Sequence, residues 1–191
     1  MKNMIGAYGS WAASMLPKEP SALSLQACPA NEFEKRRVTA RARVLECMAP
    51  PPDVAAEPKV LRHFEYDGLE IEEISWPQPA GAPTEAWVFK PANATDPLPG
   101  VLALHDHGGF KFYGKEKIAQ IGPEVHPRVK QHCDDYYGGL AWVNELARRG
   151  YVVLVHDTFT FGSRRVRLAD VPESIHWGLQ DDADESTEGT K

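Results

Sequence analysis

Residues 99–110 read Pro99-Gly-Val-Leu-Ala-Leu-His-Asp-His-Gly-Gly-Phe110, and the organisation of the chain can be worked out from them. The apolar run from Val101 to Leu104 has no polar alternation, which predicts a strand buried on both faces. The run ends in His105-Asp106-His107 and two glycines. Open α/β sheets bind their ligands at the carboxyl ends of such strands. We therefore expect a functional loop here, in which the glycines leave backbone N–H groups accessible.

Composition limits the class of protein. The chain has 191 residues, of which 42% are hydrophobic and 25% charged, and these values are ordinary for a globular protein with one substantial core. The net charge of −6 argues against a nucleic-acid binder, because such proteins present a basic face. The sequence has no apolar run of about 18 residues, so no membrane span is expected.

The cysteines and the N-terminus bear on the compartment. Cys28, Cys47 and Cys133 are scattered and odd in number, which argues against a disulfide framework and favours a reducing, cytoplasmic location. Residues 4–16 and the following Leu25-Gln-Ala-Cys28 have a weak likeness to an export signal. Glycines, serines and a Lys-Glu pair interrupt that apolar stretch. A loosely ordered N-terminal arm is expected instead.

Upstream of the central stretch, the pattern predicts one helix and three strands. Asn31 is the expected cap of a helix that Pro50-Pro-Pro52 ends. The apolar face of this helix carries Val38, Ala42, Leu45 and Met48. From residue 59 the period changes to two, and Asp67-Gly68 separates two alternating runs as a hairpin turn does. The expected strands cover residues 60–66, 69–76 and 84–90.

Downstream, the pattern predicts a strand–helix–strand unit. Residues 124–132 are polar and irregular, and Asp134 or Asp135 is the expected cap of a helix that ends at Gly150. The inner face of this helix is expected to carry Leu140, Val143, Leu146 and Ala147. Residues 151–156 are continuously apolar, so a second buried strand should lie parallel to residues 101–104.

The predicted organisation has three parts. Residues 1–58 are an N-terminal arm and helix, residues 59–170 an α/β domain, and residues 171–191 an acidic, disordered end. We expect Val152–Val155 to form the open edge of the sheet, where self-association is favoured.

The central stretch resembles the oxyanion-hole segment of the α/β-hydrolase family, which runs from a strand into a His-Gly-Gly-type loop. A second segment, Val155-His-Asp-Thr-Phe-Thr-Phe-Gly-Ser-Arg-Arg165, resembles the following strand and loop of acetyl xylan esterases and dienelactone-hydrolase-like proteins. The resemblance covers residues 84–165 and implies the N-terminal half of an α/β-hydrolase sheet. It also implies hydrolysis of a carboxylic ester through an acyl-serine, without cofactor or metal. Acetylated carbohydrate or another small ester is the implied substrate.

The resemblance also implies roles for particular residues. The oxyanion loop comprises His107, Gly108, Gly109 and Phe110, and the backbone N–H of Gly109 or Phe110 is the expected donor to the oxyanion. The residues expected to support this loop are His105, Asp106, Asp157, Gly162 and Arg164.

One part of the family pattern is missing from these residues. A serine hydrolase needs a nucleophile in a Gly-x-Ser-x-Gly elbow, followed by an acid and a histidine. Ser163, Ser174 and Ser186 all lie outside such a pattern. We therefore expect the chain to be the N-terminal part of a longer hydrolase and to be inactive alone.

Two other classes of function remain open. A metal-dependent hydrolase is one, because zinc-type ligands are frequent around the central stretch. Those ligands are His105, Asp106, His107, His132, Cys133, Asp134, His156 and Asp157. Alternate residues of a strand share a face, so among its three strand-end ligands only His105 and His107 could bind one ion. The other class is a non-catalytic binding module on a hydrolase-like scaffold.

Overall fold

The computed structural model describes residues 4–26, 28–48 and 56–176, and the chain divides into two compact units, Met1–Asp53 and Val54–Lys191. Each unit is described by itself. The predicted helix stop at Pro50-Pro-Pro52 lies outside the described residues, and so does most of the predicted disordered end over residues 171–191, namely residues 177–191.

The N-terminal unit contains two α-helices. These are α1 (Gly9–Ser14), preceded by the 3-10 turn η1 (Gly6–Tyr8), and α2 (Phe33–Cys47), preceded by η2 (Ala30–Glu32). The expected cap at Asn31 is wrong, because Asn31 belongs to the 3-10 turn and Glu32 precedes the α-helix. The apolar face of α2 forms as predicted but is not buried, since Val38 and Leu45 are more than half exposed.

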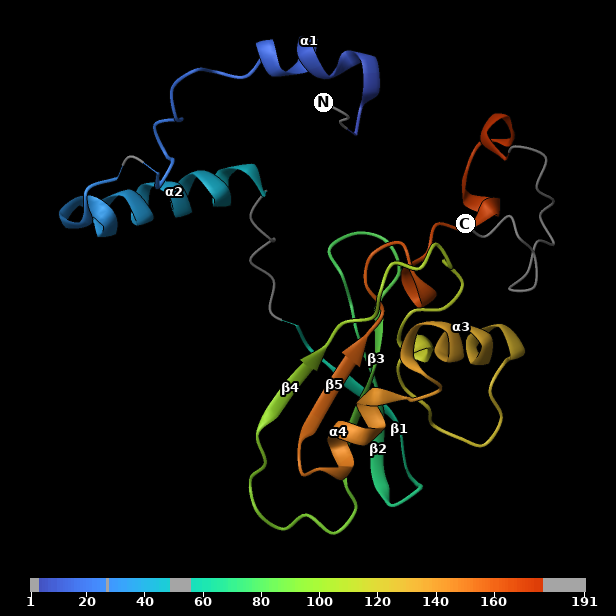
Figure 1. Ribbon diagram of the computed structural model, residues 1–191. Coiled ribbons are helices and arrows are strands. Elements are labelled where there is room, and N and C mark those ends of the chain that lie inside the picture. The colour runs from blue at the N-terminus through green and yellow to red at the C-terminus, as the bar shows by residue number, and fades with distance from the viewer. Residues whose placement is uncertain (1–3, 27, 49–55, 177–191) are drawn as a thin grey trace. The chain divides into compact units, whose positions relative to one another are not determined.

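The second unit is built on a five-stranded mixed sheet in the order β1-β2-β3-β5-β4 (Figure 1). The strands are β1 (Lys59–Tyr66), β2 (Leu69–Trp76), β3 (Thr84–Pro91), β4 (Gly100–Ala103) and β5 (Val152–His156). Asp67 and Gly68 both have positive φ, which is what a tight turn between β1 and β2 requires. The predicted hairpin is therefore confirmed.

The parallel pairing of the two apolar strands is also confirmed. Leu102 of β4 lies opposite Leu154 of β5 in a parallel ladder, and β5 pairs antiparallel with β3 on its other side. The expectation that Val152–Val155 forms the open edge is wrong, because β5 lies between β3 and β4. The two edge strands of the sheet are β1 and β4. The self-association expected at the open edge stays a prediction.

Two α-helices and a short 3-10 turn join β4 to β5. They are η3 (Lys115–Lys117), α3 (Pro127–Tyr137) and α4 (Trp142–Arg148), and three further turns follow β5: η4 (Gly162–Arg164), η5 (Leu168–Asp170) and η6 (Glu173–Ile175). The predictions of an irregular segment over 124–132 and of a cap at Asp134 or Asp135 are wrong, because both aspartates lie inside α3. His126 caps α3 through its ring, and Gly138 ends it in the left-handed conformation.

The core lies between α4 and one face of the sheet. Val143 and Ala147 of α4 are fully buried with Phe89, Val153 and Val155. The prediction that β4 is buried on both faces is wrong: Ala103 is 1% exposed, whereas Leu102 is 58% exposed on the opposite face. Within the described residues, every helix is too short or too polar to cross a membrane.

Candidate functional site

The candidate site lies where β4 and β5 end. The two strands are parallel, so the loops that follow them meet at one edge of the sheet (Figure 1). One hydrogen bond joins the loops directly, from the N–H of Gly162 to the carbonyl of Lys111 at 3.0 Å. The predicted residues of both segments are thus brought together.

His105 is held by the protein through both ring nitrogens. Nδ1 lies 2.9 Å from the carbonyl of Asp106, and Nε2 lies 3.0 Å from Oγ1 and 3.2 Å from the N–H of Thr158. The carbonyl can only accept, so Nδ1 carries the proton and Nε2 accepts. Burial lowers the pKa of His105, and its neutral form is therefore the form that fits these partners.

Asp106 points away from His105, toward α3. Its Oδ2 accepts hydrogen bonds from the hydroxyl of Tyr137 (2.6 Å) and from Nε2 of His132 (3.0 Å). Burial acts to raise the pKa of Asp106, but these two hydrogen bonds and the positive charge of Lys117 outweigh it, so the pKa is lowered. The other oxygen, Oδ1, is buried and has no hydrogen-bond partner within the described residues.

The two glycines of the loop are required by its backbone. Gly108 has φ of 49° and Gly109 has φ of 68°, a left-handed pair that L-residues rarely adopt. A Cβ on Gly108 would lie 2.5 Å from Oδ1 of Asp106, so this position is sterically closed as well. The N–H of Gly109 donates to Nδ1 of His107 at 3.1 Å, whereas the N–H of Phe110 has no acceptor among the described residues.

Asp157 joins the two loops through a buried ion pair. Its Oδ2 lies 2.8 Å from Nζ of Lys115, and both side chains are at most 5% exposed. The same carboxylate accepts from the N–H groups of Lys115 and Ser163, each at 2.9 Å. Gly114 and Gly162 lie against it so closely that a Cβ on either would overlap the carboxylate. Burial acts to raise the pKa of Asp157, but Lys115 and these hydrogen bonds lower it.

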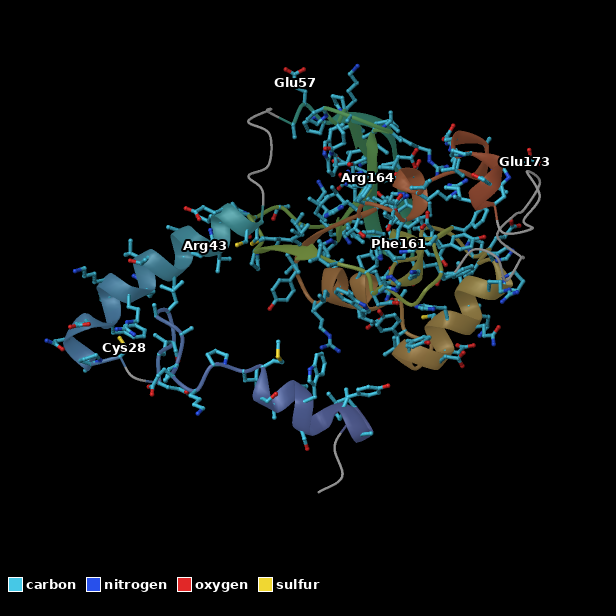
Figure 2. The ribbon with its side chains drawn as sticks, turned by 90° about the horizontal axis from the view of Figure 1, so that it is seen from above. Cys28, Arg43, Glu57, Phe161, Arg164 and Glu173 are labelled. Carbon is cyan, nitrogen blue, oxygen red and sulfur yellow. The ribbon has the colours of Figure 1, made fainter. Side chains whose placement is uncertain are left out.

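Phe161 is the apolar centre of the site, enclosed among the side chains that Figure 2 shows around its label. The rings of His105 and His107 meet it edge to face, with centroids 4.9 and 5.4 Å away. The ammonium groups of Lys111 and Lys117 lie over its ring at 3.8 and 4.4 Å from the centroid. Such cation–π contacts are strongest where water is excluded.

The two arginines of the second loop differ in their contacts. Arg164, which was expected to support the oxyanion loop, lies over the ring of Phe159, 5.6 Å from the centroid. Arg165 lies over Phe112 at 4.7 Å and donates to the carbonyl of Gly162. Sequence reasoning did not include Arg165 in the site.

Other site residues were also missing from the sequence predictions. They are Lys111, Lys115, Lys117, Tyr137 and Phe161, and His132 was considered only as a metal ligand. The one available signal was the position of Gly114-Lys-Glu-Lys117 directly after the oxyanion segment.

The proposed metal ligands do not converge. Within the described residues, the one group of three ligands close enough to share an ion is His63, Glu70 and Glu72, on the sheet far from this loop in sequence. Glu70 is already paired with His63 and with Lys90 there. Both ring nitrogens of His105 have partners in the loops, and Nδ1 and Nε2 of His107 lie 3.1 Å from the N–H of Gly109 and 3.3 Å from Nζ of Lys111. The geometry therefore offers no support for a metal site there.

A cavity of about 530 Å³ adjoins the loop. Its walls include the side chains of Trp87, Tyr113, Glu116, Lys117 and Gln120. The ring of Tyr113 contacts that of Phe110, with centroids 5.0 Å apart. The cavity is therefore adjacent to Phe110, the last residue of the loop after β4.

Comparison with known proteins identifies the fold. No protein-family model and no curated protein matches the sequence. The chain aligns with a Bacteroides fragilis protein assigned as an acetyl xylan esterase at a TM-score of 0.58 and 20% identity, over 86% of this chain and 40% of that one. A glucuronoyl esterase from Solibacter usitatus aligns at a TM-score of 0.46 and 15% identity, over 76% of this chain and 42% of the esterase. The chain spans less than half the length of either structure.

The unit that holds the five-stranded sheet thus has an α/β fold, and the fold of the chain is similar to that of the Bacteroides fragilis protein. The predicted fold class and the resemblance to esterase-like α/β hydrolases are confirmed at the level of the fold.

Proposed function

We propose that this chain provides the N-terminal part of a serine-type hydrolase that cleaves carboxylic esters through an acyl-enzyme. The observation that carries the proposal is the loop after β4, in which two left-handed glycines precede the N–H of Phe110, which meets no acceptor in the described part of the chain. An N–H group aimed at a developing oxyanion lowers the barrier by about 3 kcal/mol. Phe110 is the proposed donor rather than Gly109, because the N–H of Gly109 is bonded to His107.

We place the nucleophile, the acid and the catalytic histidine outside residues 1–191. Two observations support this placement. The sequence contains no Gly-x-Ser-x-Gly elbow, and the chain aligns with 40% of the Bacteroides fragilis protein. Residues 1–191 alone are then an incomplete active site, with the oxyanion loop but without the acyl-accepting serine.

The proposed substrate is an acetylated carbohydrate or another small ester. The cavity beside the loop supports it, because Trp87 and Tyr113 offer aromatic faces and Gln120 an amide. Apolar walls with a few polar groups are typical of sites for small polar ligands. No cofactor takes part in the proposed reaction. Because the three cysteines are free thiols, we propose a reducing, cytoplasmic location.

Hydrolysis of 4-nitrophenyl acetate tests the proposal. Purified residues 1–191 should show no hydrolysis that a serine-directed phosphonate abolishes. The reading frame continued past Lys191 should encode a strand and a Gly-x-Ser-x-Gly elbow, and the longer protein should hydrolyse the ester. Phosphonate-sensitive hydrolysis by residues 1–191, or a longer frame without the elbow, would overturn the proposal.

Two glycine variants of the longer protein test the loop itself. Gly108→Ala should lower kcat by about a hundredfold, the effect of losing one oxyanion donor, because the new Cβ displaces the loop. Gly122→Ala is the matched control, since a Cβ there meets nothing within 4 Å. Equal kcat values for the two variants would contradict the proposed role of the loop.

A further inference from the structure

Lys117 is a buried lysine without a carboxylate partner. Its side chain is fully buried in η3, and its Nζ donates to the carbonyls of Asp106 (3.3 Å) and His107 (3.1 Å). Within the described residues, no acidic oxygen lies within ion-pair distance of it. Lys115, two residues earlier in the same turn, has Asp157 at 2.8 Å. The two buried lysines of η3 therefore have different partners.

Burying an ammonium group costs desolvation free energy, which hydrogen bonds and nearby opposite charges must offset. Burial lowers the pKa of Lys117 to about 8. The charges around it come from both loops and from η3: Asp106, Glu116 and Asp157 favour the ammonium form, whereas Lys111 opposes it. The charge of Lys117 thus changes close to neutral pH, at the base of the oxyanion loop.

The contacts of Lys117 act on the peptide groups that begin the loop. A peptide group is planar and trans, so its carbonyl and the next N–H point in opposite directions. Holding the carbonyls of Asp106 and His107 fixes the N–H groups of His107 and Gly108 on the side away from Lys117. Hydrogen bonds from a charged donor also polarise the peptide and strengthen its N–H as a donor.

We propose that Lys117 is a positioning residue for the oxyanion loop: as an ammonium ion it orients and polarises the peptide groups that follow Asp106 and His107, and the neutral amine holds them less well. The contact between lysine and backbone stands independently of the reaction. Only its importance for catalysis rests on the proposed function.

Titration by NMR tests this with residues 1–191 themselves. Between pH 7 and 9.5, the amide 15N signals of His107 and Gly108 should shift with one midpoint near 8, shared with the Cε signal of Lys117. The imidazole titrations are followed separately through their ring carbons. Lys117→Met should abolish the shared midpoint. Lys111→Met, which removes the other ammonium over Phe161, should retain a shared midpoint but move it to higher pH, because Lys111 opposes the ammonium form of Lys117.

Two results would overturn the proposal. One is that the amide 15N signals of His107 and Gly108 do not shift while Lys117 titrates in the wild-type chain. This measurement does not depend on the folding of any variant. The other is a midpoint that persists in Lys117→Met. Because no ester is used, failure of the proposed esterase function would leave this result unaffected. In the longer protein, the wild type should lose kcat above pH 8 as Lys117 becomes neutral. Lys117→Met should lower kcat at least tenfold with KM within twofold, and its kcat should show no such loss.

Discussion

Lys115 and Asp157 are 42 residues apart in sequence, and they form an ion pair of 2.8 Å that lies almost entirely out of solvent. The pair joins the loop after β4 to the loop after β5. Removing the lysine would leave the Asp157 carboxylate buried without a cation, and removing Asp157 would leave Lys115 only the more exposed carboxylates of Glu116 and Glu85, so either loss is costly. The arrangement of the site therefore depends on this contact.

Asp157→Asn should lower the free energy of unfolding by about 3 kcal/mol, because Lys115 would lose the buried carboxylate at 2.8 Å and keep only the more exposed Glu116 at 3.2 Å and Glu85 at 3.7 Å. Urea denaturation at pH 7 measures this, and the exposed Asp96→Asn is the control, with less than about 0.5 kcal/mol expected. The pKa of Asp157 is lowered in the folded chain, so its stabilisation is present above pH 4 and is lost as the pH falls further. The wild type should consequently lose more stability in acid than Asp157→Asn does.

Phe161→Leu should destabilise the chain by about 2 kcal/mol, since leucine keeps most of the apolar volume but offers no ring to Lys111 and Lys117. The same change at Phe159, which is 67% exposed in the same loop, is the matched control. Comparable urea midpoints for the two variants would contradict the central packing role of Phe161.

Tyr137→Phe should raise the pKa of Asp106 and lower the free energy of unfolding by about 2 kcal/mol. The variant removes a hydrogen bond to a carboxylate whose other oxygen already has no partner. A carboxyl 13C titration and urea denaturation give the two quantities. Tyr136→Phe is the control, because that side chain is 64% exposed. An unchanged Asp106 titration in Tyr137→Phe would show that the hydrogen bond is unimportant.

Because the pKa of Lys117 is lowered in the folded chain, the free energy of unfolding should increase with pH. Its pKa is about 8 in the folded chain and 10.5 when unperturbed, so between these values the unfolded chain binds more protons. The free energy of unfolding should rise by about 2 kcal/mol from pH 8 to pH 10, as a difference of this size in pKa requires. Urea unfolding at the two pH values measures the change. Lys117→Met should remove the rise, and the exposed Lys59→Met should keep it.

The features that the sequence predicts well are local. The turn at Asp67-Gly68 is predictable because both residues tolerate the positive φ angles that it requires. Strand β5 is predictable because it begins with an uninterrupted apolar run rich in valine. The loop after β4 was also predictable, because polar residues and glycines follow a short apolar strand. Helix α3 was missed because it lacks a clear apolar periodicity. It is marked instead by single residues at its ends, Pro127 at the start and Gly138 at the end.

The features that the sequence does not predict depend on distant partners. Hydrophobic periodicity indicates which residues form strands but not the order of the strands in the sheet, so it does not place β5 between β3 and β4. A lysine is normally assigned to the surface, so nothing in Lys115 or Lys117 indicates burial. Their burial is possible because Asp157 and two backbone carbonyls lie where the folded loops meet.

The hydrogen bond from the N–H of Lys115 to Asp157 also has a kinetic consequence. The carboxylate reaches this amide only after the whole crossover from β4 to β5 has closed, which is a long-range and therefore slow event in folding. The amide proton can then be replaced by solvent only when that crossover opens. Deuterium uptake at this single backbone position should therefore follow the cooperative opening of the parallel pair, although the residue belongs to a loop.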